Sequence, residues 1–200
     1  MHKEEKEIRE RGFEIVAGVD EAGRGPLAGP VVAAAVILPE TYRNKDIQDS
    51  KKLTDIRREQ LFIEIKNAAL SYAVGIVGWK QIDEMGILNA SKLAMRQAVL
   101  KLNPVPDFVF TDAVAINVMD IPQKAIIKGD QKVFCVAAAS ILAKVARDHL
   151  MLNYHKKYPH YGFDQHMGYG TEIHLNAIRK HGPCPIHRMS FSPLKIYSSS

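Results

Sequence analysis

The stretch that decides the fold lies at residues 18–30 and reads GVDEAGRGPLAGP. It follows a short apolar run at residues 15–17 and precedes a longer one at residues 31–38. This order predicts a strand, a glycine-rich turn and a second strand. Asp20 and Glu21 therefore stand together at the end of a buried strand.

Two adjacent carboxylates at such a position need an explanation. An isolated buried carboxylate costs on the order of tens of kcal/mol in the idealised limit, so it must be paired, protonated, hydrated or bound to a metal. We favour a metal site. The alternative is a tight hairpin in which the glycines serve only the turn geometry, with Asp20 and Glu21 as hydrated charges at the strand end.

The glycine spacing of this stretch does not fit two common nucleotide-binding motifs. Pro26 interrupts the turn and no helical pattern follows, which argues against the dinucleotide-binding fingerprint. A P-loop would need Lys and then Ser or Thr where Arg24 and Gly25 stand. The turn instead places small residues around one arginine, so that a ligand can approach the backbone closely.

Composition and length are those of an ordinary globular protein, with 200 residues, 46% of them hydrophobic and 24% charged. No apolar run approaches the ~20 residues that span a bilayer, and residues 1–14 lack a signal-peptide core. We therefore expect a cytoplasmic protein with no membrane segment, and a monomer by default. Two cysteines, Cys135 and Cys184, fit a reducing compartment and are too few for a disulfide framework or a four-cysteine zinc site.

The net charge of +5 is unevenly distributed. Residues 101–200 carry 12 basic and 7 acidic side chains, whereas residues 1–100 carry 15 of each. An excess of positive charge in one half suggests a polyanionic partner. A generic basic surface explains the charge equally well.

Hydrophobic periodicity predicts an α/β protein with a mixed sheet. Strands are expected at residues 14–21, 30–38, 72–78, 108–112 and 124–128. Helices are expected at residues 4–12, 55–70, 82–103 with a break at Gly86, 132–157 and 172–180, with Thr54 and Thr171 as N-caps. The expected layout is a charged tail or helix at 1–13, a catalytic domain at 14–150 and a small helical extension at 151–200.

Four carboxylates share one pattern, since each stands at the edge of an apolar segment and beside a turn: Asp20, Glu21, Asp112 and Asp130. If the strands that end at Asp20 and Asp112 are neighbours, these side chains converge at one edge of the sheet. Oxygen ligands suit Mg²⁺ or Mn²⁺ better than zinc, and such clusters hold two ions ~3.5–4 Å apart. Asp130 as a helix cap and Asp112 as an exposed strand end remain alternatives.

Five ordered blocks between about residue 14 and Pro193 resemble the signature of ribonuclease HII, the bacterial type 2 ribonuclease H: residues 18–26, 49–53 (DSKKL), 128–130 (KGD), 137–148 (AAASILAKVARD) and 168–171 (GYGT). The resemblance implies a ribonuclease H-like sheet of five strands flanked by helices. It also implies an endonuclease that cuts the RNA strand of RNA–DNA hybrids and incises duplex DNA 5′ to embedded ribonucleotides. The implied products are 3′-hydroxyl and 5′-phosphate ends, and the implied role is ribonucleotide and RNA-primer removal in replication and repair.

The same resemblance implies a role for each residue of the site. Asp20, Glu21, Asp112 and Asp130 would be the catalytic metal ligands for two Mg²⁺ or Mn²⁺ ions. The turn Gly23-Arg24-Gly25 would test for the 2′-hydroxyl, and Tyr169 would stack on the sugar of the following deoxynucleotide. Phosphates of the hybrid would be held by Lys51, Lys52, Ser140 and Lys144, the last two lying on one helix face. Two departures from the family pattern are Ala113, where glycine is more common, and Gly170, where many members have proline.

Other features receive plainer interpretations. Seven of the eight histidines lie between His149 and His187, yet the His181, Cys184 and His187 spacing offers only three zinc ligands, so we expect a hydrated or phosphate-facing set. Cys135 is expected in the core, and Trp79 is expected to pack within a turn. The aromatic residues at 154–163 would either line a nucleic-acid groove or anchor the extension. Two rival functions are a hybrid-binding module without cleavage and a small-molecule phosphohydrolase.

Overall fold

A computed structural model describes residues 3–48, 53–116 and 120–197. Five strands form one mixed sheet in the order β3-β2-β1-β4-β5. They comprise β1 (Val16–Ala22), β2 (Val31–Ile37), β3 (Ser71–Val77), β4 (Phe108–Asp112) and β5 (Gln123–Ile126). β1 pairs antiparallel with β2 and parallel with β4, and β5 extends the parallel part. The predicted five-stranded mixed sheet is confirmed.

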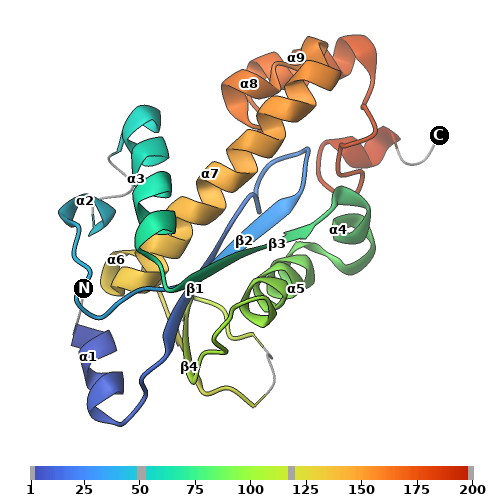
Figure 1. The fold of residues 1–200 in the computed structure, drawn as a ribbon. Helices are drawn as coiled ribbons and strands as arrows, with labels where there is room; N and C mark the ends of the chain where they lie inside the picture. Colours follow the sequence, from blue (N-terminus) through green and yellow to red (C-terminus); the bar gives the residue numbers. More distant parts are fainter. Residues whose placement is uncertain (1–2, 49–52, 117–119, 198–200) are drawn as a thin grey trace.

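Helices cover both faces of this sheet (Figure 1). α5 (Ile87–Leu100) packs on one face, preceded by α4 (Trp79–Met85). α3 (Asp55–Ala68) and α7 (Phe134–Lys157) cover the other face, with α2 (Lys45–Gln48) and α6 (Gly129–Lys132) beside them. Successive side chains of β2 point to opposite faces of the sheet, so both faces are apolar and both are covered by helices. Ala33 and Ala35 face α5, whereas Ala34 and Val36 face α7.

The predicted N-caps of two helices are present. The Thr54 side chain accepts a hydrogen bond from the Arg57 amide at 3.2 Å, and α3 begins at the next residue. Thr171 caps α9 (Glu172–His181) in the same way, through the His174 amide. Trp79 was expected in a turn but is the first residue of α4, where its ring packs on Tyr154 at 5.7 Å.

The C-terminal residues form a small lobe at the far end of α7 (Figure 1). It contains the short 3₁₀ helices at Pro159–Tyr161 and Leu194–Tyr197, α8 (Phe163–His166) and α9. Tyr161 and Phe163 are buried there against Leu27 and Ala28 from the glycine-rich turn. The anchoring role is therefore supported for these aromatic residues. Because α7 runs through residue 150 without a break, the lobe and the sheet share one long helix.

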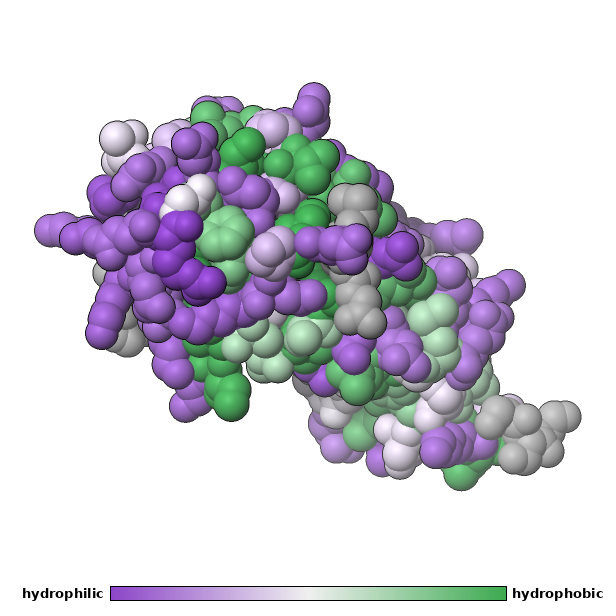
Figure 2. Space-filling model, turned by 90° about the horizontal axis from the view of Figure 1, so that it is seen from below, coloured by the Kyte–Doolittle hydropathy of each residue, from purple (hydrophilic) through white to green (hydrophobic). Residues whose placement is uncertain are grey.

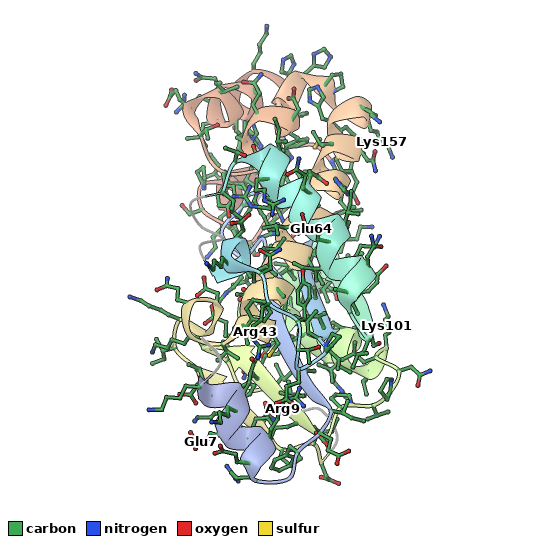
Figure 3. The ribbon with its side chains drawn as sticks, turned by 60° about the vertical axis from the view of Figure 1, so that its left-hand side comes forward. Glu7, Arg9, Arg43, Glu64, Lys101 and Lys157 are labelled. Carbon is green, nitrogen blue, oxygen red and sulfur yellow. The ribbon has the colours of Figure 1, made fainter. Side chains whose placement is uncertain are left out.

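The N-terminal residues form α1 (Lys3–Glu10), which is docked onto the domain. Glu5 accepts a hydrogen bond from the Cys135 amide at 2.8 Å, and Glu4 pairs with Lys124 at 2.6 Å. Arg9 and Arg43, labelled in Figure 3, both line a cavity of about 360 Å³ together with Cys135. Hydrophilic side chains predominate on the α1 side of the face in Figure 2. None of the helices over the described residues is long and apolar enough to cross a membrane.

Gly18 lets β1 approach the start of α7, and replacing it tests that packing. A Cβ atom at Gly18 would lie 2.2 Å from the Cys135 carbonyl carbon, so the strand and helix backbones would have to separate. We expect Gly18→Ala to lower the free energy of unfolding by about 3 kcal/mol or more, as measured by urea denaturation. The matched control is Gly78→Ala, whose Cβ meets nothing within 4 Å. An equal, small loss in both variants would contradict this packing argument.

Candidate active site

Two of the predicted carboxylates follow neighbouring strands. In the parallel pairing of β1 with β4, Val19 lies opposite Thr111. Asp20 and Asp112 are the next residues of the two strands, so they stand side by side at one edge of the sheet. Asp20 is only 7% exposed and accepts a hydrogen bond from the Glu21 amide at 2.7 Å.

Asp130 is held near this edge of the sheet because the preceding residue, Gly129, forms a hydrogen bond with Asp112. The Gly129 amide donates to Asp112 Oδ1 at 2.8 Å, which ties the start of α6 to the end of β4. Lys128 has a left-handed backbone (φ 59°), and this conformation turns the chain from β5 into α6. Asp130 in the first turn of α6 is buried, with 5% exposure.

Burial and the neighbouring carboxylates raise the pKa of Asp20. Its pKa is raised well above 3.8, first by burial and then by the negative charges of Glu21, Asp112 and Asp130. Burial also raises the pKa of Glu21, while the Arg24 guanidinium, 3.3 Å from Glu21 Oε1, opposes that rise. These carboxylates repel one another, and a cation between them would remove the repulsion.

The residues present fit a divalent cation. Glu21 Oε2 is buried and has no hydrogen-bond partner among the residues that the structure describes, which is costly unless a ligand satisfies it. The candidate metal ligands at this edge are all carboxylate oxygens, which Mg²⁺ and Mn²⁺ prefer. Within the described ranges, no three His, Cys, Asp or Glu side chains are already arranged closely enough to enclose an ion. The carboxylates thus share an edge of the sheet without forming a closed cage.

The predicted substrate residues meet in one cavity beside Glu21. Its volume is about 360 Å³, and its walls include Gly23, Arg24, Gly25, Ser140, Lys144 and Tyr169. Ser140 and Lys144 reach it from α7, and Lys144 also pairs with Asp148 at 2.7 Å. Tyr169 is 48% exposed, and a Cβ atom added at Gly25 would lie 3.5 Å from Cε1 of its ring, so the ring faces the turn. Lys51 and Lys52 lie outside the described residues.

The histidine prediction was wrong in part. His174 and His187 are buried at 0% and 1% exposure, and their Nε2 atoms lie 3.0 Å apart. The Cys184 amide donates to His187 Nδ1 at 2.8 Å, and His174 Nδ1 lies 2.8 Å from the Tyr169 carbonyl oxygen. These contacts fix the tautomers: His187 Nε2–H donates to His174 Nε2, and His174 Nδ1–H donates to Tyr169. A chain of neutral imidazoles therefore supports the loop that carries Tyr169.

Two further residues of the site were assigned no role from the sequence, although Arg147 lies within the resemblance block at residues 137–148. Arg147 and Arg188 are 1% and 0% exposed, and their guanidinium groups lie directly beneath the glycine-rich turn. Arg147 lies on α7, seven residues after the small-residue stretch at 137–140, and Arg188 follows His187. The sequence does not distinguish a buried arginine from a surface one, so only the structure shows that both are buried beneath the turn.

A five-stranded mixed sheet with carboxylates at the ends of β1 and β4, and a basic cavity beside them, defines a nuclease of the ribonuclease H-like class. Residues 17–193 match the family model described as Ribonuclease HII. The chain belongs to the ribonuclease HII family.

Individual relatives agree with this family. The chain is 55% identical over 188 residues to a ribonuclease HII of Acetivibrio thermocellus, covering 94% of this chain and 73% of the relative. The crystal structure of ribonuclease H2 from Pyrococcus horikoshii OT3 matches with a TM-score of 0.78 at 31% identity, covering 93% of this chain and 98% of that chain. The ribonuclease HII in a complex with PCNA from Archaeoglobus fulgidus matches with a TM-score of 0.75 at 26% identity, covering 90% and 96%. The protein is therefore a ribonuclease H, a metal-dependent endonuclease that acts on RNA–DNA hybrids.

Proposed function

We propose that the protein incises duplex DNA on the 5′ side of an embedded ribonucleotide and also cuts the RNA strand of longer hybrids. The products carry 3′-hydroxyl and 5′-phosphate ends. The observation that best supports this activity is the cavity in which the Gly23–Gly25 turn, Tyr169 and Glu21 meet. A single ribonucleotide differs from its neighbours only by its 2′-hydroxyl, so recognition needs backbone donors and a flat ring close to the cleaved bond.

Asp20, Glu21, Asp112 and Asp130 would hold two ions of Mg²⁺ or Mn²⁺. Such ions, when bound, lower the pKa of an attacking water and stabilise the negative charge that develops on the departing 3′-oxygen. The protein contributes position and electrostatics, because the strand ends and α6 hold the carboxylates on a rigid edge. The hydrogen bond between Asp112 and the Gly129 amide holds Asp112 close to Asp130, the residue after Gly129.

The remaining residues of the cavity would hold the substrate. The amides of the Gly23-Arg24-Gly25 turn would contact the ribonucleotide, and Tyr169 would stack on the sugar that follows it. Ser140 and Lys144 would bind phosphates from α7, and Lys51 and Lys52 would bind phosphates further along the strand. These contacts read the sugar and the backbone, so cleavage should depend little on base identity.

In the cell, this activity would remove misincorporated ribonucleotides and RNA primers during replication and repair in the cytoplasm. One chain contains all four candidate ligands and the cavity residues, so we propose that it works as a monomer. A binding module without cleavage is disfavoured, because buried carboxylates next to phosphates weaken binding unless a cation neutralises them.

The direct test uses an end-labelled DNA duplex with one ribonucleotide, an all-DNA duplex and a long hybrid, each with Mg²⁺ or Mn²⁺. We expect a single cut 5′ to the ribonucleotide, cleavage of the hybrid and no cleavage of the all-DNA duplex. Tyr169→Ala should lower cleavage of the single-ribonucleotide duplex roughly 10- to 100-fold, because stacking on an aromatic ring contributes ~1–3 kcal/mol.

The matched control is Tyr72→Ala, since Tyr72 is 40% exposed on the edge strand β3 and is not part of the cavity. Its cleavage rate should equal that of the wild type. Cleavage of hybrids without incision at a single ribonucleotide would contradict the proposed activity. Equal effects of the two tyrosine variants would contradict the role of Tyr169.

A further inference from the structure

The glycine-rich turn rests on a buried guanidinium group. Arg188 is fully buried, and it donates from Nη2 to the Gly23 carbonyl at 2.6 Å and from Nη1 to the Arg24 carbonyl at 3.0 Å. Its Nε donates to the Gly29 carbonyl at 2.9 Å. The guanidinium therefore bonds to both ends of the 23–29 turn, and it has no ion-pair partner in the part of the chain that the structure describes.

These contacts set the direction of two amide groups. In a trans peptide the C=O and N–H bonds point in opposite directions. The carbonyls of Gly23 and Arg24 point inward to Arg188, so the amides of Arg24 and Gly25 point away from it. Neither amide has an acceptor among the described residues. Because Arg24 and Gly25 line the cavity beside Glu21, these two donors are available to a ligand there.

A second buried arginine joins this turn to the loop that carries Tyr169. Arg147 donates to the Pro30 carbonyl at 3.0 Å, to the Ala28 carbonyl at 3.2 Å and to the Met167 carbonyl at 2.9 Å. A Cβ atom at Gly23 would lie 2.1 Å from Arg147 Nε, so the guanidinium packs directly against the turn. The two walls of the cavity are thus fixed relative to each other.

Neither guanidinium group forms an ion pair with a carboxylate of the described residues, and burying a charge in this way destabilises the fold. Burial lowers the pKa of Arg188 to about 9 and that of Arg147 to about 10, so both stay charged at neutral pH. A cation bound to a carbonyl also polarises the peptide and strengthens the N–H on its other side as a donor. The planar guanidinium groups satisfy six carbonyl oxygens of the turn and its neighbours, which apolar packing would leave without hydrogen-bond donors.

We propose that Arg188 is a positioning residue for ribose discrimination. It holds the peptides of the turn so that the Arg24 and Gly25 amides face the 2′-hydroxyl and the adjacent phosphate of a ribonucleotide. Arg147 supports the same geometry from the Tyr169 side. This inference rests on the proposed incision at single ribonucleotides. It adds the residue that orients the Arg24 and Gly25 amides.

The test is Arg188→Lys, which keeps the positive charge but removes the planar fork that reaches two carbonyls at once. Binding is measured by fluorescence anisotropy with Ca²⁺ in place of Mg²⁺, on a duplex with one ribonucleotide and on its all-DNA counterpart. We expect affinity for the all-DNA duplex to change by less than about threefold, and the preference for the ribonucleotide duplex to fall about tenfold or more. With Mg²⁺, kcat/KM on that duplex should fall in parallel.

The matched control is Arg179→Lys, since Arg179 lies exposed on α9 and pairs with Glu172. It should keep the wild-type preference and melting temperature. A second measurement does not depend on how well the variant folds: in ¹⁵N spectra of the wild type, the Arg24 and Gly25 amides should shift with the ribonucleotide duplex and much less with all-DNA.

The outcomes separate the two proposals. A wild type that cuts hybrids but shows no preference for the single-ribonucleotide duplex overturns the proposed function. A wild type with that preference, together with a lysine variant that retains it in full, overturns the role of Arg188. Equal shifts of the two amides with both duplexes would also overturn it.

Discussion

Replacing Asp20 with asparagine is expected to abolish cleavage and to stabilise the metal-free protein. Asp20 is buried beside Glu21 and Asp112, so its charge is repelled in the folded state and solvated in the unfolded state. Asparagine has the same volume and keeps an oxygen that can accept the Glu21 amide hydrogen bond. We expect the free energy of unfolding to rise, because the repulsion is removed, and cleavage to fall about 10³-fold or more.

Thermal unfolding with EDTA and cleavage assays with Mg²⁺ measure the two effects. Adding Mg²⁺ should raise the melting temperature of the wild type more than that of the variant, because a ligand stabilises the state that binds it. Asp120→Asn is the control, since Asp120 is exposed and outside the cavity. The assignment of Asp20 as a catalytic metal ligand would be contradicted if the variant unfolds at ordinary temperature or cuts as fast as the wild type.

Acid should unfold the C-terminal lobe through its buried histidines. Burial lowers the pKa of both His174 and His187 from 6.5 to about 4. Between these pH values the unfolded chain binds protons that the folded chain excludes, so stability is complete above pH 6.5 and falls as the pH drops towards 4. A shift of this size corresponds to about 3 kcal/mol for one histidine.

The control separates these histidines from the exposed ones. His174→Gln should lower stability at pH 7, because the hydrogen bond to the Tyr169 carbonyl is altered, and it should flatten the loss between pH 6.5 and 4. His160→Gln, at an exposed histidine, should keep the wild-type slope. Urea denaturation at several pH values measures both. An unchanged slope in His174→Gln would contradict a contribution of His174 to the acid transition.

Much of the fold could be predicted from local pattern. The alternation of β2, the caps Thr54 and Thr171 and the apolar strands before Asp20 and Asp112 all depend on residues close in sequence. The resemblance blocks also identified the residues of the cavity around Glu21, and the structure brings the described ones together. The roles of these residues remain predictions that the experiments above test.

Burial of polar groups could not be predicted in this way. Hydrophobic periodicity marks the apolar residues that leave water, but a polar residue is buried only where distant groups satisfy it. Arg188 depends on the Gly23 carbonyl, 165 residues earlier in the chain, and Asp112 on an amide 17 residues later. His174 is neutral because burial in the packed lobe lowers its pKa, and Tyr169 and His187 lie against its two ring nitrogens.

Local sequence patterns predicted the five strands, the longer helices and the residue types at the end of β1, because short-range sterics and apolar burial govern those features. The short helices α2, α6 and α8 were not predicted. The tertiary structure decided which carbonyls the buried arginines hold and which histidines lose their protons. It also decided where the amides of the turn point. These outcomes arise from hydrogen bonds between segments that meet only when the sheet, α7 and the C-terminal lobe are packed together.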